Sequence, residues 1–377
     1  MNQHILLTTS LVCLVTFLCD RTALTQEKDF NAYPQEVAKF LERIYGDKQQ
    51  PLAYRKDYAG GFDKWQQNAR RALRQKIGLQ KIAASVGDHQ PVVKLDAPED
   101  LGEYLRQKGV IETEPDVKIP FWFLKPKGKG TWPLGVFPHG HDRVGHNTTA
   151  GVYSDEEHKR KSLAEDRDVA VQAVKLGFIT VAPAVRGLST NGVPDLHGRH
   201  GKRACRSQAM HCLLAGRTAI GERVWDMQQI LNWAMKLQGV DSRHVLMMGN
   251  SGGGMVTLFT AACDERIRIA IPSCSFAPTI SRSGYVFHCD CNMVPGLIEL
   301  GGLPGVAGLI APRHLLAVNG RTDSLFSEAA IERAATETKA IYKAAGYPDR
   351  FEHRWGAAGH RFYVDLMWPF VITALQD

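Results

Sequence analysis

From residue 134 onward, short apolar runs alternate with longer segments of helical periodicity. A short apolar run fits a buried strand, whereas apolar residues at every third or fourth position fit a helix that covers a sheet. Their alternation is typical of right-handed crossovers onto a mostly parallel, doubly wound sheet with helices on both faces. The sequence therefore predicts an α/β fold, with strands at 134–137, 178–182, 245–248, 267–271, 315–318 and 351–355 and helices over 162–175, 218–237 and 328–345, after residue 251 and after the last strand.

Further elements are expected before and within this region. Apolar residues recur at helical spacing over 37–44 until Gly46, and again over 65–77 until Gly78. Extended runs follow over 103–126, joined by a predicted hairpin turn at Pro115-Asp116. We therefore expect an N-terminal helical extension over 26–100 and a main domain over 101–377. In the main domain, Ser162 and Glu165 fit a capping box at a helix start.

The first 25 residues are of a different kind. Residues 5–19 are apolar and uncharged, and a stretch of small residues follows. This pattern is typical of a secretory signal peptide, with cleavage expected between residues 23 and 26. The apolar run is shorter than the roughly 20 residues of a membrane span. The sequence thus predicts a signal peptide over 1–25 and export to the periplasm or the medium, with an uncleaved anchor as the alternative.

The net charge of +7 comes from basic residues scattered along the chain. A nucleic-acid-binding protein gathers them in a tract or on one face, so no nucleic-acid partner is expected. No segment after the leader is apolar enough to span a membrane. The sequence leaves the oligomeric state open.

Six of the eight cysteines lie after the predicted leader. Export permits disulfides, and one or two bridges of open connectivity are expected among the cysteines in predicted loops: Cys205, Cys212, Cys289 and Cys291. Cys263 and Cys274 fit the core. The run HCDCN at 288–292 resembles half of a zinc site, but one C-x-C without a second paired motif is a weak signal. No metal site is therefore predicted.

The sequence GNSGGGM at 249–255 lies between an apolar run and a helical segment. Its first five residues match G-x-S-x-G, in which a sharp strand-to-helix turn lifts a serine hydroxyl above the edge of a sheet. Small neighbours are needed because the central residue takes an unusual backbone conformation. The start of the helix then offers backbone N–H groups to a developing oxyanion. This pattern predicts Ser251 as a nucleophile and the N–H of Gly252 as an oxyanion donor.

Cofactor-binding motifs do not fit these glycines. A dinucleotide-binding G-x-G-x-x-G that begins at Gly252 needs glycine where Thr257 stands. A phosphate-binding G-x-x-x-x-G-K that begins at Gly249 needs lysine where Met255 stands. No cofactor is therefore predicted.

A serine nucleophile needs a base, and the base needs a carboxylate that orients it. Asp323 and His360 follow the last two predicted strands, so both are expected beyond the carboxyl ends of strands. The order Ser, Asp, His is that of the α/β-hydrolase triad. The alternative role of Asp323 is to cap the next helix, and Glu328 is then the reserve carboxylate.

The second oxyanion donor is expected in the loop PHGHD at 138–142. Its glycine allows the backbone N–H of His141 to point inward, opposite that of Gly252. The alternative is a metal set of His139, His141 and Asp142. It is disfavoured because the residues that follow do not continue the H-x-H-x-D-H signature of binuclear metallohydrolases.

Five segments together resemble the secreted α/β-hydrolases grouped with acetyl xylan esterases and dienelactone hydrolases: PHGHD, VRGLS, GVDSRHVLMMGNSGGGM, IAPRHLLAVNGRTD and GAAGH. The resemblance covers residues 100–375. It implies a serine carboxylic-ester hydrolase with Ser251 as nucleophile, His360 as base and Asp323 as the residue that orients it. Gly252 and His141 are then the oxyanion donors. The chain departs from acetyl xylan esterases in Gly252, where they commonly carry Gln, and from dienelactone hydrolases in its serine nucleophile.

The sequence therefore predicts an exported serine esterase that acts on a small-molecule or polysaccharide ester, with an acylated carbohydrate implied by the resemblance. A serine peptidase or another acyl hydrolase on the same fold is one alternative. A catalytically inactive relative that serves as a binding protein is the other.

Overall fold

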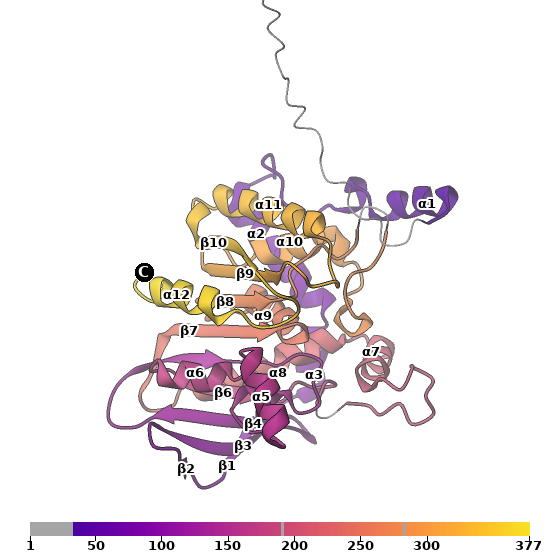
Figure 1. Cartoon of the computed structure of the whole chain (residues 1–377). Coiled ribbons are helices and arrows are strands. Elements are labelled where there is room, and N and C mark those ends of the chain that lie inside the picture. Colours follow the sequence, from indigo (N-terminus) through magenta and orange to yellow (C-terminus); the bar gives the residue numbers. More distant parts are fainter. Residues whose placement is uncertain (1–32, 190–191, 282–283) are drawn as a thin grey trace, which may run out of the picture.

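The computed structural model describes residues 33–189, 192–281 and 284–377. In these residues one ten-stranded sheet runs through the molecule, and helices pack on both of its faces (Figure 1). The strand order is β1-β3-β4-β6-β5-β7-β8-β9-β10, with β2 also paired to β3. The strands are β1 (Val92–Leu95), β2 (Glu99–Asp100), β3 (Tyr104–Glu114), β4 (Val117–Pro126), β5 (Trp132–Val136), β6 (Ile179–Pro183), β7 (Val240–Asn250), β8 (Ile269–Ser273), β9 (His314–Gly320) and β10 (Phe351–Gly356).

The sheet is parallel from β6 through β10 and antiparallel in its N-terminal part, from β1 to the pair of β4 and β6. β3 and β4 form the predicted hairpin, and Asp116 takes a positive φ of 65° in its turn. The predicted α/β fold with a mostly parallel, doubly wound sheet is thus confirmed.

The direction of strand addition reverses at β5. This strand lies between β6 and β7, so the connection after β5 leads to one side of it and the connection after β6 leads to the other. Such a reversal leaves a crevice beyond the carboxyl ends of the strands. The loop 138–142 follows β5 and Ser251 follows β7, and both line a cavity at this point.

The sheet divides the apolar core into two layers. On β7, Val245 and Met247 belong to one layer and Leu246 and Met248 to the other, because successive side chains of a strand point to opposite faces. Helices α6 (Val169–Lys175) and α12 (Val364–Ala374) contribute to the smaller layer. The larger layer contains residues of α2 (Gly61–Lys76), α3 (Leu79–Val86), α8 (Ala219–Ala234), α9 (Gly252–Cys263), α10 (Gly302–Gly308) and α11 (Glu328–Ala344).

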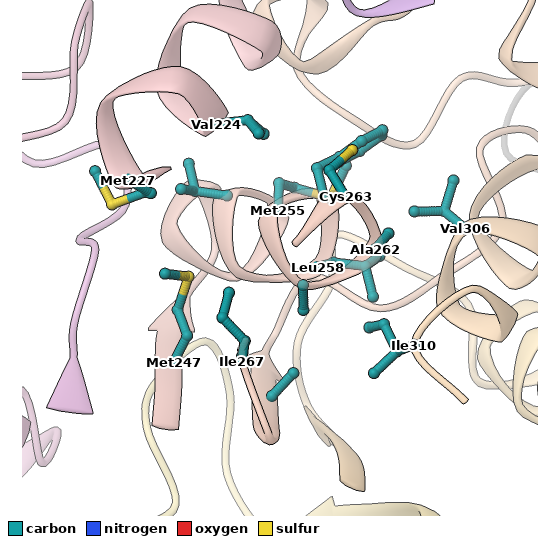
Figure 2. Packing of buried hydrophobic residues seen from close by; sticks show 14 of the residues in the cluster. Val224, Met227, Met247, Met255, Leu258, Ala262, Cys263, Ile267, Val306 and Ile310 are labelled. Atoms are coloured by element: carbon teal, nitrogen blue, oxygen red, sulfur yellow. The ribbon is translucent and has the colours of Figure 1, made fainter. Parts of the chain in front are cut away.

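Helix α9, which begins directly after Ser251, is buried along its whole length. Met255, Leu258 and Ala262 lie among side chains of α8, β7 and α10 (Figure 2). A helix that is apolar all round belongs to a core. Ser251 is therefore attached to one of the most deeply packed elements of the molecule.

Three arginines satisfy carbonyl groups at the C-terminal end of α9. Arg70 Nε donates to Ala262 O at 3.1 Å, Arg74 Nη1 to Cys263 O at 2.8 Å, and Arg313 Nη2 to Ala261 O at 2.7 Å. Cations at this end of a helix are favourable because its last carbonyls carry partial negative charge. Two of the three arginines come from α2, so the N-terminal segment supports the helix that follows Ser251.

The N-terminal region contains the two predicted helices, α1 (Gln35–Tyr45) and α2, and also α3, which the sequence analysis did not predict. β1 and β2 lie before residue 101 and pair with β3. The domain boundary at residue 100 stays a prediction. The predicted signal peptide lies outside the described residues. None of the described helices combines the length and the apolar composition that a membrane span requires.

Two local predictions were wrong. The segment 162–175 forms two helices, α5 (Glu156–Ala164) and α6, and Ser162 lies inside α5 rather than at a helix start. The N-cap is Asp155, whose carboxylate accepts from His158 N at 2.7 Å. Cys205 and Cys212 lie on helix α7 (Ala204–Leu214), not in a loop. The remaining helices are α4 (Gly145–Thr149), η1 (Asp47–Gln49), η2 (Asp290–Asn292), η3 (Leu297–Leu300) and η4 (Pro348–Arg350).

Candidate active site

Ser251 occupies the turn between β7 and α9 in a conformation that L-residues rarely adopt. Its φ is 57° and its ψ is −122°. Such a backbone conformation costs about 1–3 kcal/mol and persists only where the surroundings enforce it. Here the N–H of Ser251 donates to Ser273 O of β8 at 2.8 Å, and the packed α9 follows. The strained turn agrees with the sharp elbow predicted from the sequence.

The glycines around Ser251 allow the chain to approach itself closely. A Cβ at Gly253 would lie 2.1 Å from Pro138 O, and one at Gly254 would lie 2.1 Å from Ser275 Oγ. A Cβ at Gly140 would lie 3.0 Å from Ser251 Cβ. The loop 138–142 therefore runs directly beside the turn, and a side chain at Gly253 or Gly140 would push the two apart, whereas one at Gly254 would collide with Ser275.

His360 and Asp323 are hydrogen-bonded to each other. His360 Nδ1 lies 2.7 Å from Asp323 Oδ2, and the second oxygen of Asp323 accepts from Leu325 N at 3.1 Å. The Asp323 side chain is only 3% exposed, whereas that of His360 is 29% exposed. His360 and Ser251 line the same cavity. No hydrogen bond joins these two side chains among the described residues, and such contacts are often long before substrate binds.

Cys274 and Tyr363 hold the loop that carries His360. The thiol of Cys274 donates to Arg361 O at 3.3 Å, and the hydroxyl of Tyr363 donates to Gly359 O at 2.5 Å. Burial raises the pKa of the Cys274 thiol to about 11, so the thiol keeps its proton at neutral pH. Cys274 was expected in the core and is buried there, but its hydrogen bond to the His360 loop was not predicted.

The backbone N–H groups of Gly252 and His141 are both available. Neither donates a hydrogen bond to any residue that the structure describes. They flank the same turn, because a Cβ at Gly140 would lie 3.4 Å from Gly252 N. Two free N–H groups beside a serine are the arrangement that an oxyanion requires.

His139 is held as a neutral ring by the protein. Val185 N donates to its Nε2 at 3.0 Å, and its Nδ1 lies 2.7 Å from Gly140 O, so Nδ1 carries the proton. Burial and the neighbouring His146 lower the pKa of His139 to about 3. Since both ring nitrogens have protein partners, His139 has none left for a metal. The alternative metal set of His139, His141 and Asp142 is therefore not formed.

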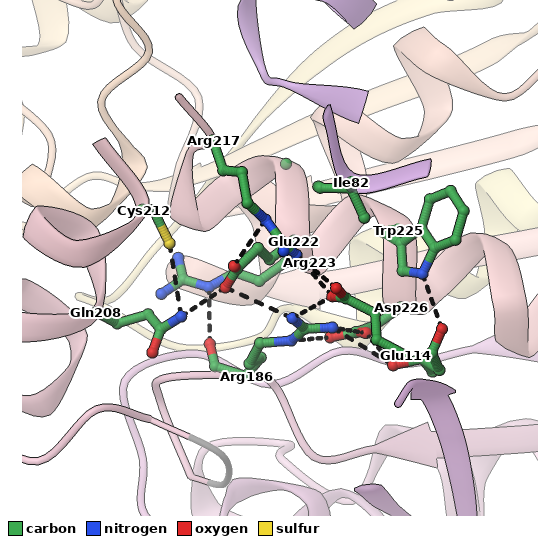
Figure 3. A network of polar contacts seen from close by, with 12 residues as sticks. Ile82, Glu114, Arg186, Gln208, Cys212, Arg217, Glu222, Arg223, Trp225 and Asp226 are labelled. Carbon is green, nitrogen blue, oxygen red and sulfur yellow. Dashed lines mark hydrogen bonds and ion pairs between the residues drawn. The ribbon is translucent and has the colours of Figure 1, made fainter. Parts of the chain in front are cut away.

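Arg186 of the VRGLS segment anchors the loop after β6 in a buried ionic network (Figure 3). Its guanidinium contacts Glu114 at 2.5 Å and Asp226 at 2.9 Å, and its side chain is 4% exposed. The same loop supplies Val185 N and Ser189 Oγ to His139 Nε2. The network thus supports the loop 138–142 through His139. The segment VRGLS is part of the family resemblance, but its sequence alone does not reveal this role of Arg186.

The cavity beside Ser251 has a volume of about 250 Å³. Ser251 and His360 lie in its wall together with the loop 138–142 and with Thr148, Thr149, Arg167 and Phe362. Arg167 is paired with Glu165 at 2.5 Å and lies 3.7 Å from Asp142. The cavity is small and mixed in polarity.

The predicted disulfides are not formed, because the six described cysteines are all free thiols. Three of them, Cys205, Cys289 and Cys291, lie with the His141 side chain in one cluster. Desolvation opposes a charge on His141, but the thiols of Cys205 and Cys291 raise the pKa of its imidazole to about 9.

Comparison with known proteins shows a relative of low sequence identity and many solved structures of similar fold. No family model matches the chain. A Bacillus subtilis protein, YtaP, provisionally named as a hydrolase, is 24% identical over 305 residues, which are 77% of this chain and 94% of that protein.

The solved structures of three esterases resemble this one. Methylesterase BT1017 has a TM-score of 0.63 and 19% identity, over 90% of this chain and 68% of that one. A provisionally named acetyl xylan esterase from Bacteroides fragilis has a TM-score of 0.68 and 15% identity, and the match covers 94% of this chain and 97% of that protein. A glucuronoyl esterase from Solibacter usitatus has a TM-score of 0.62 and 15% identity, and the match covers 87% of this chain and 97% of that protein. The chain has the fold of these proteins, the α/β-hydrolase fold expected from the sequence.

Proposed function

We propose that this protein is an exported serine esterase that removes small acyl groups from a carbohydrate. One observation carries the proposal: His360 is hydrogen-bonded to the buried Asp323 at the wall of the cavity that Ser251 also lines. The proteins of similar fold that are named as esterases support the ester class.

In the proposed reaction, His360 Nε2 takes the proton of Ser251 while Ser251 Oγ attacks the ester carbonyl carbon. Asp323 orients the ring and stabilises the imidazolium. The N–H groups of Gly252 and His141 bind the oxyanion, and each contributes about 10²- to 10³-fold in rate. His360 then gives its proton to the departing alcohol, and a water molecule activated by the same ring hydrolyses the acyl-enzyme.

The size of the cavity favours a small acyl group. Its 250 Å³ lies below the roughly 300–1,000 Å³ of pockets that enclose drug-sized ligands. We therefore expect acetyl esters of sugars to be hydrolysed faster than feruloyl esters, with the sugar outside the cavity. A panel of acetylated, feruloylated and glucuronoyl esters measures this preference. Cleavage of peptide anilides without cleavage of esters would favour the peptidase alternative.

The central test is Ser251→Ala. This variant should lose both the hydrolysis of p-nitrophenyl acetate and covalent labelling by a fluorophosphonate, because the attacking oxygen is gone. Ser242→Ala is the matched control, since Ser242 is an exposed serine near the opposite end of β7. Full activity of Ser251→Ala would contradict the proposal. A wild-type chain that binds acetylated glycans but is never labelled would indicate the inactive binding protein instead.

A further inference from the structure

Four potential metal ligands converge beside the loop that carries His141. They come from three parts of the chain: His141 follows β5, Cys205 lies at the start of α7, and Cys289 and Cys291 lie at η2. Their ligand atoms all lie within 4.8 Å of one another. His141 Nε2 and Cys291 Sγ are 3.3 Å apart.

These distances suit a tetrahedral zinc site. Zinc binds cysteine sulfur at about 2.3 Å and histidine nitrogen at about 2.0–2.1 Å, which separates neighbouring ligand atoms by roughly 3.5–3.8 Å. Small side-chain shifts would bring the four atoms to that spacing. A disulfide would join only two of the sulfurs, at about 2.05 Å, and leave a thiol and the imidazole unexplained. All four groups are accounted for by one metal ion.

The buried Arg223 next to the cluster fits its charge. Arg223 is fully buried, and its Nη1 lies 3.5 Å from Cys291 Sγ and 3.0 Å from Asn292 Oδ1. Its Nη2 has no hydrogen-bond partner among the described residues. Three thiolates and one Zn²⁺ carry a net charge of −1, which the guanidinium offsets. In metal sites, residues that do not bind the metal commonly donate hydrogen bonds to the ligand atoms.

Gly252 leaves room for the imidazole in this position. A Cβ at residue 252 would lie 3.0 Å from His141 Nδ1 and 3.2 Å from His141 Cε1. The ring therefore packs against the start of α9 while its Nε2 points to the sulfurs. His141 and Cys289 are not fully buried, so an ion can enter from solvent.

We propose that His141, Cys205, Cys289 and Cys291 bind one zinc ion, which fixes the loop 138–142 beside Ser251 and with it the backbone N–H of His141. Thiolate and imidazole ligands in a tetrahedron select zinc, and with all four positions filled by protein the site is structural. The positioning of the N–H rests on the proposed esterase function, whereas the metal binding does not.

Metal content tests the site directly. The full chain, purified from zinc-supplemented medium, should contain about one zinc per molecule, whereas Cys291→Ser and Cys289→Ser should contain almost none. Cys212→Ser is the matched control, because Cys212 lies on the same helix α7 as Cys205 but outside the cluster, and it should keep its zinc. When cobalt replaces zinc in the wild-type chain, the protein should show the visible absorption of a tetrahedral thiolate site. This measurement does not depend on the folding of any variant. A zinc-free wild-type chain, or a disulfide between two of the three cysteines in peptide mapping, would overturn the proposal.

Activity measurements separate this proposal from the proposed function. Ser251→Ala should be inactive and still contain zinc. Cys291→Ser should lose zinc and show kcat lowered by about 10- to 100-fold with KM little changed, since the loop loses its anchor while Ser251 stays labelled by the phosphonate. A Ser251→Ala variant that contains zinc and is still active would support the metal site and contradict the proposed esterase mechanism. Unchanged kcat in a zinc-free Cys291→Ser variant would refute the positioning role.

Discussion

Asp323 uses one carboxylate oxygen for His360 and the other for the backbone of Leu325. Asp323→Asn keeps the shape of the side chain, but an amide N–H facing Nδ1 favours the wrong tautomer of the ring. In the proposed mechanism we expect kcat for p-nitrophenyl acetate to fall by about 10⁴-fold. Steady-state kinetics on the purified variant measures this.

Glu328 provides the control for Asp323. This carboxylate is about half exposed and is paired with Arg321 rather than with His360. Glu328→Gln should therefore keep wild-type kcat. A large loss in Glu328→Gln and a small one in Asp323→Asn would reverse the assignment of the acid.

For single residues, the order Ser, Asp, His along the chain was enough to predict side chains that lie together in the structure. Asp323 and His360 were found because each follows a strand that the apolar pattern predicts. The cysteine cluster was not found, because its members lie far apart in the chain and Cys205 was assigned to a loop. The local signal was the C-x-C of residues 289–291, which carries little information until the fold brings His141 and Cys205 beside it. The roles of Ser251, Asp323, His360, Gly252 and His141 in catalysis stay predictions until tested.

Among the elements, the loop after β6 depends on Arg186. Arg186→Ala would leave Asp226 buried without its cation, whereas Glu114 would keep its contact with Arg217 at 2.7 Å. Breaking a buried ion pair in this way costs about 3–5 kcal/mol. We expect the free energy of unfolding, measured with urea, to fall by that amount. Activity should fall as well, because the same loop holds His139.

An exposed ion pair serves as the comparison for Arg186. Arg243 contacts Asp241 at 2.9 Å, but its side chain is 81% exposed. Arg243→Ala should leave the urea midpoint unchanged, because water replaces the lost contact. Equal losses in the two variants would mean that the buried network does not stabilise the loop.

Among the predicted elements, β10 and α11 agree best with the structure. They were expected over 351–355 and 328–345 and run over Phe351–Gly356 and Glu328–Ala344, whereas β7 was expected over 245–248 and begins at Val240. Helix α7 was missed because it buries the polar Ser207 and Gln208 beside Ala209 and two cysteines, so it lacks an apolar stripe. The predicted helix over 162–175 is interrupted at Asp166, whose positive φ of 55° ends a helix. A strong periodicity identifies a buried face, whereas breaks and polar interfaces are decided by tertiary contacts.

For the whole molecule, buried histidines predict sensitivity to mild acid. Burial lowers the pKa to about 3 for His139 and to about 4 for three others: His146, His288 and His353. In the unfolded chain these rings have a pKa of about 6.5. The unfolded state therefore binds more protons below pH 6.5, and the stability present at pH 7 is lost as the pH falls. With these pKa values each ring accounts for a loss of about 2 kcal/mol between pH 7 and pH 5, and the four together for roughly 7 kcal/mol.

Urea unfolding at pH 7, 6 and 5 measures this loss. In this window most carboxylates stay charged, so the histidines dominate the change. His353→Gln removes one of the four rings and should reduce the difference between pH 7 and pH 5. A free energy of unfolding that is constant over this range would contradict the prediction.

The overall architecture was predictable because one periodicity belongs to strands and another to helices. The sequence did not predict where the N-terminal segment packs on the main domain. The pattern over 65–77 shows that α2 buries one face, but it contains no information on the partner. The structure shows that α2 packs in the same core as α9, with Trp65, Leu73 and Ile77 fully buried.

The contact of α2 with α9 also has a consequence for biosynthesis. Arg70 and Arg74 bind carbonyls that lie 192 and 189 residues further along the chain. At about 5–20 residues per second, that interval takes roughly 10–40 s of translation. During this time α3 is made and can pack against α2, but the part of the apolar face of α2 that packs against α9 stays uncovered. The newly made chain therefore requires a chaperone or remains partly unfolded until α9 has emerged.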